Sequence, residues 1–156
     1  MSMELWALSD RQLNSIAEWQ DAIAAEGFTL ALAKDVSFER LNGFLPCQLR
    51  GELTGFECYR DDAAALMRNN EGFNFGHEWK YALGFRWLGS KQSETLAAWM
   101  AGTAYPRATA GIIINDQDSV LRTAAHSAEV VRDIESPSRV YEEAKRELRR
   151  RRGLKQ

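Results

Sequence analysis

Long apolar runs are missing from this chain of 156 residues, and stretches such as Ala63–Met67 and Leu96–Ala101 are far shorter than a membrane span. A membrane-spanning helix needs about 20 consecutive apolar residues, so the sequence predicts none. The first residues, Met1–Trp6, carry a glutamate where a secretion signal would carry lysine or arginine. We therefore expect a cytoplasmic protein with no contact with membranes.

Cysteine and proline are also scarce, with two and three residues respectively. Cys47 and Cys58 are too few for a disulfide framework, and a low-complexity class does not fit a chain with 45% hydrophobic residues. A chain of this length buries roughly two thirds of its unfolded surface, which is enough for a core of its own. We expect residues 1–156 to form a single domain.

Charge is unevenly distributed, although the formal net charge is only −2. Residues 1–71 hold 6 basic and 12 acidic side chains, residues 72–140 hold 7 of each, and residues 141–156 hold 7 basic and 3 acidic ones. An acidic surface repels phosphates and attracts basic partners. Nucleic acid is therefore an unfavourable partner for the body of the protein. The basic helix or tail from about residue 138 suits an anionic surface, but we favour the alternative that its cations stabilise the negative end of a helix dipole.

Hydrophobic periodicity and turn residues predict the main elements. Helical spacing covers 10–26 behind a capping signal at Ser9, residues 91–104 up to Pro106, and two further segments that begin at Thr123 and Ser138. Asp61 or Asp62 caps a short helix at 63–68. Strands are predicted at 28–32, at 48–59 as one bent strand or a glycine-linked pair, at 81–88 and at 110–115, while 36–47 is a short helix or irregular.

The order of these elements predicts an α+β fold. Strand 81–88, helix 91–104 and strand 110–115 have the length of a parallel β-α-β crossover, and the other strands are free to pair antiparallel. We expect a mixed, mostly antiparallel sheet of about four or five strands packed with about as many helices.

Familiar catalytic and metal-binding motifs are not found in the sequence. His77 is followed by Glu78 but lacks the second histidine of a zinc-binding helix, and neither a CxxC pair nor a glycine-rich phosphate loop occurs. Cys58 paired with His77 or His126 would make a nucleophile, but a strand cysteine more often packs inward as a small apolar side chain. We predict no enzyme activity, no metal and no cofactor.

Acidic turns and tryptophans provide the remaining functional signal. The pairs Asp61–Asp62 and Asp116/Asp118 lie in turn signals, where aspartate serves as a cap. Five tryptophans are present, and Trp79 and Trp87 lie where partial exposure is expected. Exposed acids beside aromatic side chains are what a basic partner protein would contact.

The stretch Gly55–Asp62, together with the segment from His77 through Tyr81–Trp87 to Gly111–Asn115, resembles small bacterial immunity proteins. Such proteins are cytoplasmic partners of toxins delivered between cells by type VI or contact-dependent secretion. The resemblance covers about the middle half of the chain. It implies a small α+β protein without chemistry of its own that occludes the active site of one cognate toxin.

Three hypotheses therefore stand. The leading one is an immunity protein that binds a toxin with a basic active-site surface through residues Glu57, Asp61, Asp62, Glu71, Trp79 and Trp87. The second is a small enzyme or ligand-binding module with a pocket around Phe73, Phe75, His77 and Cys58. The third is RNA binding by the tail Arg149–Arg152.

Overall fold

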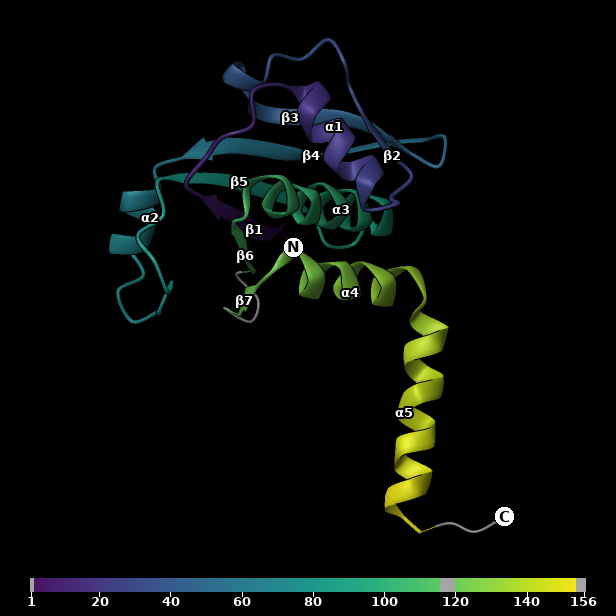
Figure 1. Cartoon of the computed structure of the whole chain (residues 1–156). Coiled ribbons are helices and arrows are strands. Elements are labelled where there is room, and N and C mark those ends of the chain that lie inside the picture. Colours follow the sequence, from purple (N-terminus) through teal and green to yellow (C-terminus); the bar gives the residue numbers. More distant parts are fainter. Residues whose placement is uncertain (1, 116–119, 154–156) are drawn as a thin grey trace.

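A computed structural model describes residues 2–115 and 120–153, with side chains for all of these except 137–143. Within them the chain forms seven strands and five α-helices, in an α+β arrangement (Figure 1). The strands are β1 (Ser2–Ser9), β2 (Leu30–Leu32), β3 (Asn42–Leu49), β4 (Glu52–Asp61), β5 (Tyr81–Leu88), β6 (Ile112–Asn115) and β7 (Leu121–Arg122). The helices are α1 (Ile16–Ala25), α2 (Ala63–Arg68), α3 (Gln92–Thr109), α4 (Ala124–Glu135) and α5 (Pro137–Arg151), with a 3₁₀ helix at Phe38–Arg40.

All seven strands form one sheet in the order β2-β3-β4-β5-β1-β6-β7, and every neighbouring pair is antiparallel. Because β5 and β6 both run antiparallel to β1, they are parallel to each other. The predicted β-α-β unit therefore exists, but β1 lies between its two strands. The sheet is antiparallel throughout and not mixed as predicted, because no two parallel strands are direct neighbours. It has more strands than expected because Ser2–Ser9 and Leu121–Arg122 were not predicted as strands.

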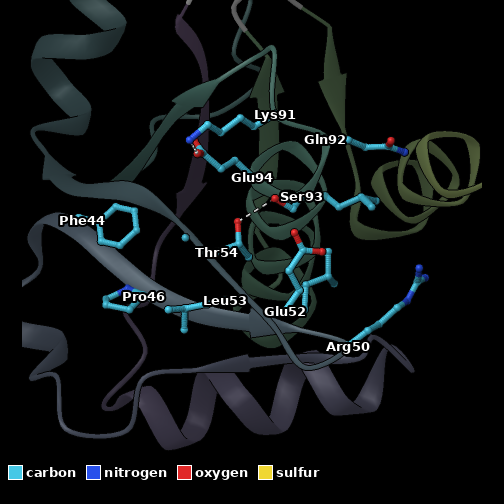
Figure 2. Close-up of a pocket in the computed structure, with 13 residues that line it drawn as sticks. Phe44, Pro46, Arg50, Glu52, Leu53, Thr54, Lys91, Gln92, Ser93 and Glu94 are labelled. Atoms are coloured by element: carbon cyan, nitrogen blue, oxygen red, sulfur yellow. Dashed lines mark hydrogen bonds and ion pairs between the residues drawn. The ribbon is translucent and has the colours of Figure 1, made fainter.

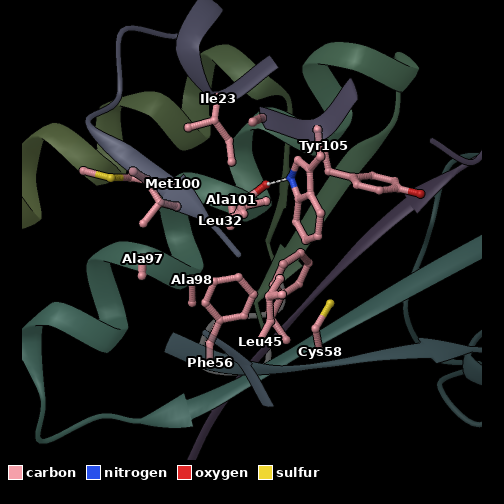
Figure 3. Packing of buried hydrophobic residues seen from close by; sticks show 14 of the residues in the cluster. Ile23, Leu32, Leu45, Phe56, Cys58, Ala97, Ala98, Met100, Ala101 and Tyr105 are labelled. Carbon is pink, nitrogen blue, oxygen red and sulfur yellow. Dashed lines mark hydrogen bonds between the residues drawn. The ribbon is translucent and has the colours of Figure 1, made fainter. Parts of the chain in front are cut away.

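One face of the sheet is covered by helices. α3 packs against β1, β4 and β5, and α1 packs against α3. Leu5, Phe56 and Phe85 from the strands lie with Trp19 and Met100 from the helices in the main hydrophobic core. Figure 3 shows Phe56 and Met100 in this core. α4 packs against α3 and also contacts β6 and β7, and α5 leads away from the body (Figure 1).

Several predicted boundaries were wrong. α1 begins at Ile16, since the Ser15 side chain accepts from the Glu18 N–H, while the Ser9 hydroxyl donates to a carbonyl within its own turn. Pro106 does not close α3, which continues to Thr109 and ends at a left-handed Ala110. Lys91 is the N-cap of α3, and Ser136 is the N-cap of α5, which therefore begins before Ser138.

Residues 42–49 form a strand although they contain a proline. The Pro46 carbonyl accepts from the Ala33 N–H, and in an antiparallel strand the nitrogen of a residue faces the same side as its carbonyl. That side lies past Leu32, where β2 ends, so Pro46 costs no hydrogen bond between strands. The two-residue turn after β3 has Arg50 and Gly51 with positive φ, so a glycine joins two strands, which was one of the two alternatives predicted for 48–59. The prediction for 36–47 was wrong from residue 42 onward, because β3 occupies Asn42–Leu49 and only Phe38–Arg40 is helical.

Candidate functional site

The face of the sheet opposite α1 and α3 is only partly covered. At one end, α2 and the segment after it pack on the sheet in a second cluster built around Leu8, Phe75 and Ile114. Beyond this cluster, side chains of β1, β3, β4 and β5 are accessible to solvent. We call this surface the open face; it comprises Glu4, Trp6, Phe44, Pro46, Leu53, Glu57, Tyr59, Asp61, Arg86 and Leu88, and the buried Gly84 forms part of its floor.

Strand register arranges a charged row across the open face. Glu57 and Glu4 stand opposite Arg86 on its two sides, and directly opposed side chains in a sheet lie close enough to interact. The Arg86 guanidinium donates to a Glu4 oxygen, with the two atoms 2.7 Å apart, and this contact raises the pKa of Arg86 above its ordinary value. The Tyr59 hydroxyl donates to Glu57 over 2.7 Å, which raises the pKa of Tyr59.

A glycine allows a second row to form beside the first. Tyr59 and Trp6 stand opposite Gly84 on its two sides, and the Trp6 indole N–H donates to Asp61 over 3.0 Å. A Cβ atom on Gly84 would lie 2.7 Å from that Asp61 oxygen and 3.2 Å from the indole nitrogen. Only glycine therefore leaves this contact undisturbed. A hollow of about 330 Å³ lies here, lined in part by Trp6, Tyr59 and Arg86.

The neighbouring part of the open face is apolar. Leu53 is 76% exposed, Phe44 61% and Leu88 44%. The Phe44 ring lies across β4, where a Cβ atom on Gly55 would come within 2.3 Å of it. These side chains belong to regular strands, so their exposure is a fixed property of the surface.

A groove of about 1060 Å³ borders this apolar part, between the β3–β4 hairpin and the start of α3. Figure 2 shows Phe44, Pro46 and Leu53 on the hairpin side and Lys91 and Glu94 on the helix side. The Thr54 and Ser93 hydroxyls, 3.1 Å apart, join the two walls. The groove therefore presents apolar and charged side chains to one ligand surface.

The predicted binding residues divide between different parts of the molecule. Glu57 and Asp61 both lie on the open face. Asp62 is the N-cap of α2 and accepts from two backbone N–H groups, while Glu71 is exposed in the loop after that helix. Trp79 is half-buried, as expected, and its indole donates to the Phe75 carbonyl.

The expectation for Trp87 was wrong. Its side chain is only 3% exposed, and its indole donates to the Thr95 hydroxyl over 2.9 Å. Trp87 alternates with Arg86 and therefore points to the covered face, where it packs in the main core. It cannot contact a partner at the surface.

The alternative pocket is formed in part. Phe73, Phe75 and His77 line a groove of about 750 Å³ beside Trp79, and His77 Nε2 lies 2.6 Å from a carboxylate oxygen of Asp10. Cys58 does not belong to this groove. It is fully buried in the main core, and burial raises the pKa of its thiol, which disfavours a nucleophilic thiolate (Figure 3).

Neither histidine pairs with a thiol among the residues that the structure describes: His77 contacts Asp10, and His126 is exposed on α4. Within residues 2–115 and 120–153, no group of three or more metal-binding side chains is found. Asp61 and Asp62 serve separate contacts, and Asp116 and Asp118 lie outside the described residues. None of the described helices has the length and apolar character needed to span a bilayer.

The basic tail is separate from the open face. Arg149–Arg152 are exposed in the last turn of α5, and Glu147 forms ion pairs with Arg150 and Arg151. Cations at this position are favourable because the C-terminal end of a helix carries a partial negative charge.

Sequence reasoning missed Glu4, Trp6, Tyr59 and Arg86 as parts of a shared surface. The available signal was alternation: Glu4 and Trp6, Glu57 through Asp61, and Gly84 and Arg86 each repeat with the period of two that places side chains on one face. Without a strand at 2–9, the first of these segments has no place in the sheet. Comparisons of the chain with protein-family models, with curated proteins and with solved structures found no match to any of them.

Proposed function

We propose that this protein is a non-enzymatic inhibitor that binds a basic protein toxin through its open face and covers the toxin's active site. The observation that carries the proposal is the exposure of Leu53 and Phe44 on regular strands, beside a row of carboxylates. Exposed apolar side chains rimmed by polar ones are typical of protein-interaction surfaces.

Charge favours a basic partner. Glu4, Glu57 and Asp61 face a single cation, Arg86, so this part of the open face has a formal charge of −2. The first 71 residues, which supply most of the face, also carry twice as many acids as bases. Complementary charge accelerates association and rejects acidic competitors.

The apolar part would supply affinity. Large side chains that become desolvated at the centre of an interface account for most binding energy, while the polar rim sets orientation. Leu53 and Phe44 are positioned for the first role, and Glu57 for the second.

A toxin is the partner class that the sequence resemblance implies. An enzyme that cleaves nucleic acid or modifies a nucleotide needs a positively charged site, and an acidic surface seated on that site would exclude the substrate. The inhibitor needs no reactive group for this role, which agrees with the buried positions of Cys47 and Cys58.

The proposal is tested by mixing the purified chain with the product of its neighbouring gene, then measuring complex formation by size-exclusion chromatography and residual toxin activity. We expect a complex that the substitution Glu57→Lys weakens and that Glu129→Lys, the same change on exposed α4, leaves intact. A free chain and an uninhibited toxin would contradict the proposal. So would a homodimer that Glu57→Lys dissociates, because a second copy would then occupy the open face.

A further inference from the structure

We infer that the hollow beside Gly84 is a receptor for an arginine side chain of the partner protein. The inference rests on the proposed function, because it identifies which partner group the open face receives. It follows from the shape of the hollow, the rings that flank it and the carboxylate at its margin.

The hollow forms because Gly84, which has no side chain, lies between two aromatic residues on the neighbouring strands. Neighbouring strands lie about 4.8 Å apart, so the backbones of Tyr59 and Trp6, each one strand from Gly84, stand roughly 10 Å apart. The volume of about 330 Å³ accommodates a planar group that reaches the sheet from above. A guanidinium is planar and packs against aromatic faces, whereas an ammonium is a compact and strongly hydrated charge.

One of the two rings, that of Tyr59, already holds a guanidinium. The Arg86 guanidinium carbon lies 5.8 Å from the centroid of the Tyr59 ring, within the range of cation–π attraction. Arg86 is neutralised by its ion pair with Glu4. Arg60 also lines the hollow, but its guanidinium donates to the Glu39 carbonyl and to Gln12 and lies over the Phe38 ring. An incoming cation therefore meets aromatic surface beside two guanidinium groups that already have partners.

Asp61 gives the hollow its preference for a cation. One of its carboxylate oxygens accepts from the Trp6 indole, and among the residues that the structure describes, Trp6 is the only side chain that donates to it. The second oxygen is available to an arginine, whose donors match a carboxylate geometrically. An anionic ligand would meet the carboxylates of Asp61 and Glu4, which both line the hollow, so the hollow disfavours it.

The experiment titrates the full-length, isotope-labelled protein with the capped peptide acetyl-Gly-Arg-Gly-amide and follows the indole N–H resonance of Trp6 by NMR, assigned with Trp6→Phe. Matched peptides carry lysine or the neutral isostere citrulline. We expect a saturable shift with arginine and a dissociation constant at least about tenfold weaker with either of the other two. Equal binding of arginine and citrulline would overturn the inference.

Two variants locate the binding. Asp61→Asn keeps an oxygen that accepts from Trp6 but removes the charge, and Gly84→Ala places a methyl group where only 2.7 Å separates it from the Asp61 oxygen. Each is expected to weaken arginine-peptide binding at least about tenfold, while Glu129→Gln, the same loss of charge on α4, leaves it unchanged. Wild-type affinity in a folded Asp61→Asn protein would also overturn the inference.

The two proposals fail in different ways. If the peptide binds at Trp6 but no toxin complex forms, the arginine receptor stands and the proposed function falls. If a toxin complex forms and Asp61→Asn leaves its affinity unchanged, the proposed function stands and the arginine receptor falls.

Discussion

Replacing Leu53 with threonine separates a contribution to binding from a contribution to folding. Leu53 lies on β4 with 76% of its surface exposed, whereas Leu49, at the end of the paired strand β3, is 5% exposed in the main core. Threonine retains a high preference for strands, so the same substitution at both positions changes mainly the apolar surface. Leu49→Thr is therefore the matched control.

The exposed fractions set the expected magnitudes. Full burial of a leucine side chain contributes about 2 kcal/mol. In the free protein Leu53 realises about a quarter of this, about 0.5 kcal/mol, because 76% of it remains in water. A partner that covers Leu53 would gain the remaining part, about 1.5 kcal/mol, which corresponds to about a tenfold change in the dissociation constant. Leu49→Thr should instead lower the free energy of unfolding by at least about 2 kcal/mol.

Urea unfolding followed by tryptophan fluorescence measures the free energy of unfolding, and titration calorimetry with the proposed toxin partner measures the dissociation constant. We expect Leu53→Thr to unfold nearly as the parent protein does and to bind about tenfold more weakly. If Leu53→Thr destabilises the protein as much as Leu49→Thr does, the side chain belongs to the core and the reasoning is refuted. Unchanged affinity in a complex that forms would equally refute it.

Three further outcomes follow from other contacts. Cys47 and Cys58 should resist alkylation by iodoacetamide at pH 8 until the protein is denatured, because burial raises both thiol pKa values, that of Cys47 to about 12; rapid native-state labelling would contradict their placement. Asp62→Ala should lower the unfolding free energy by about 1 kcal/mol, since the α2 N-cap is lost, whereas Asp62→Asn should retain most of it in urea titrations. Hydrogen bonds from the Asn14 N–H and from Arg11 lower the pKa of Glu18, so the ionised side chain stabilises the folded protein above pH 4.5, and this stabilisation is lost as the pH falls below that value. Glu18→Gln should therefore flatten the plot of unfolding free energy against pH in the acidic range. An unchanged plot in that range would contradict the prediction.

Local signals predicted those elements whose sequence pattern matches their environment. Tyr81–Leu88 alternates and forms a strand with one face in the core, and Asp62 and Thr123 cap the helices expected after them. Ser2–Ser9 was missed because β1 lies at the centre of the sheet: Leu5 packs in the main core and Leu8 in the second cluster, on opposite faces. A short strand with apolar side chains on both faces has no pattern that separates it from other structures.

Long-range register explains why only part of the site was predictable. Glu57 and Asp61 were identified as binding residues from their own segment, and both lie on the open face. Trp87 was expected to be exposed because it ends a strand beside Arg86, yet the alternation of that strand sends the two residues to opposite faces. Which face is covered depends on where α1 and α3 pack, and this is decided by contacts between segments far apart in the sequence.

The insertion of β1 between β5 and β6 has a functional consequence. Glu4 and Trp6 are the partners of Arg86 and Asp61, so the charged row and the hollow exist only when the N-terminal strand is paired with β5. β1 also supplies Leu5 to the main core, and loss of the strand would therefore disrupt the fold together with the site. A surface built from paired strands is already ordered before binding, so the binding free energy is not reduced by the entropic cost of ordering it. Under the proposed function, such preorganisation would favour recognition of a toxin before the toxin reaches its substrate.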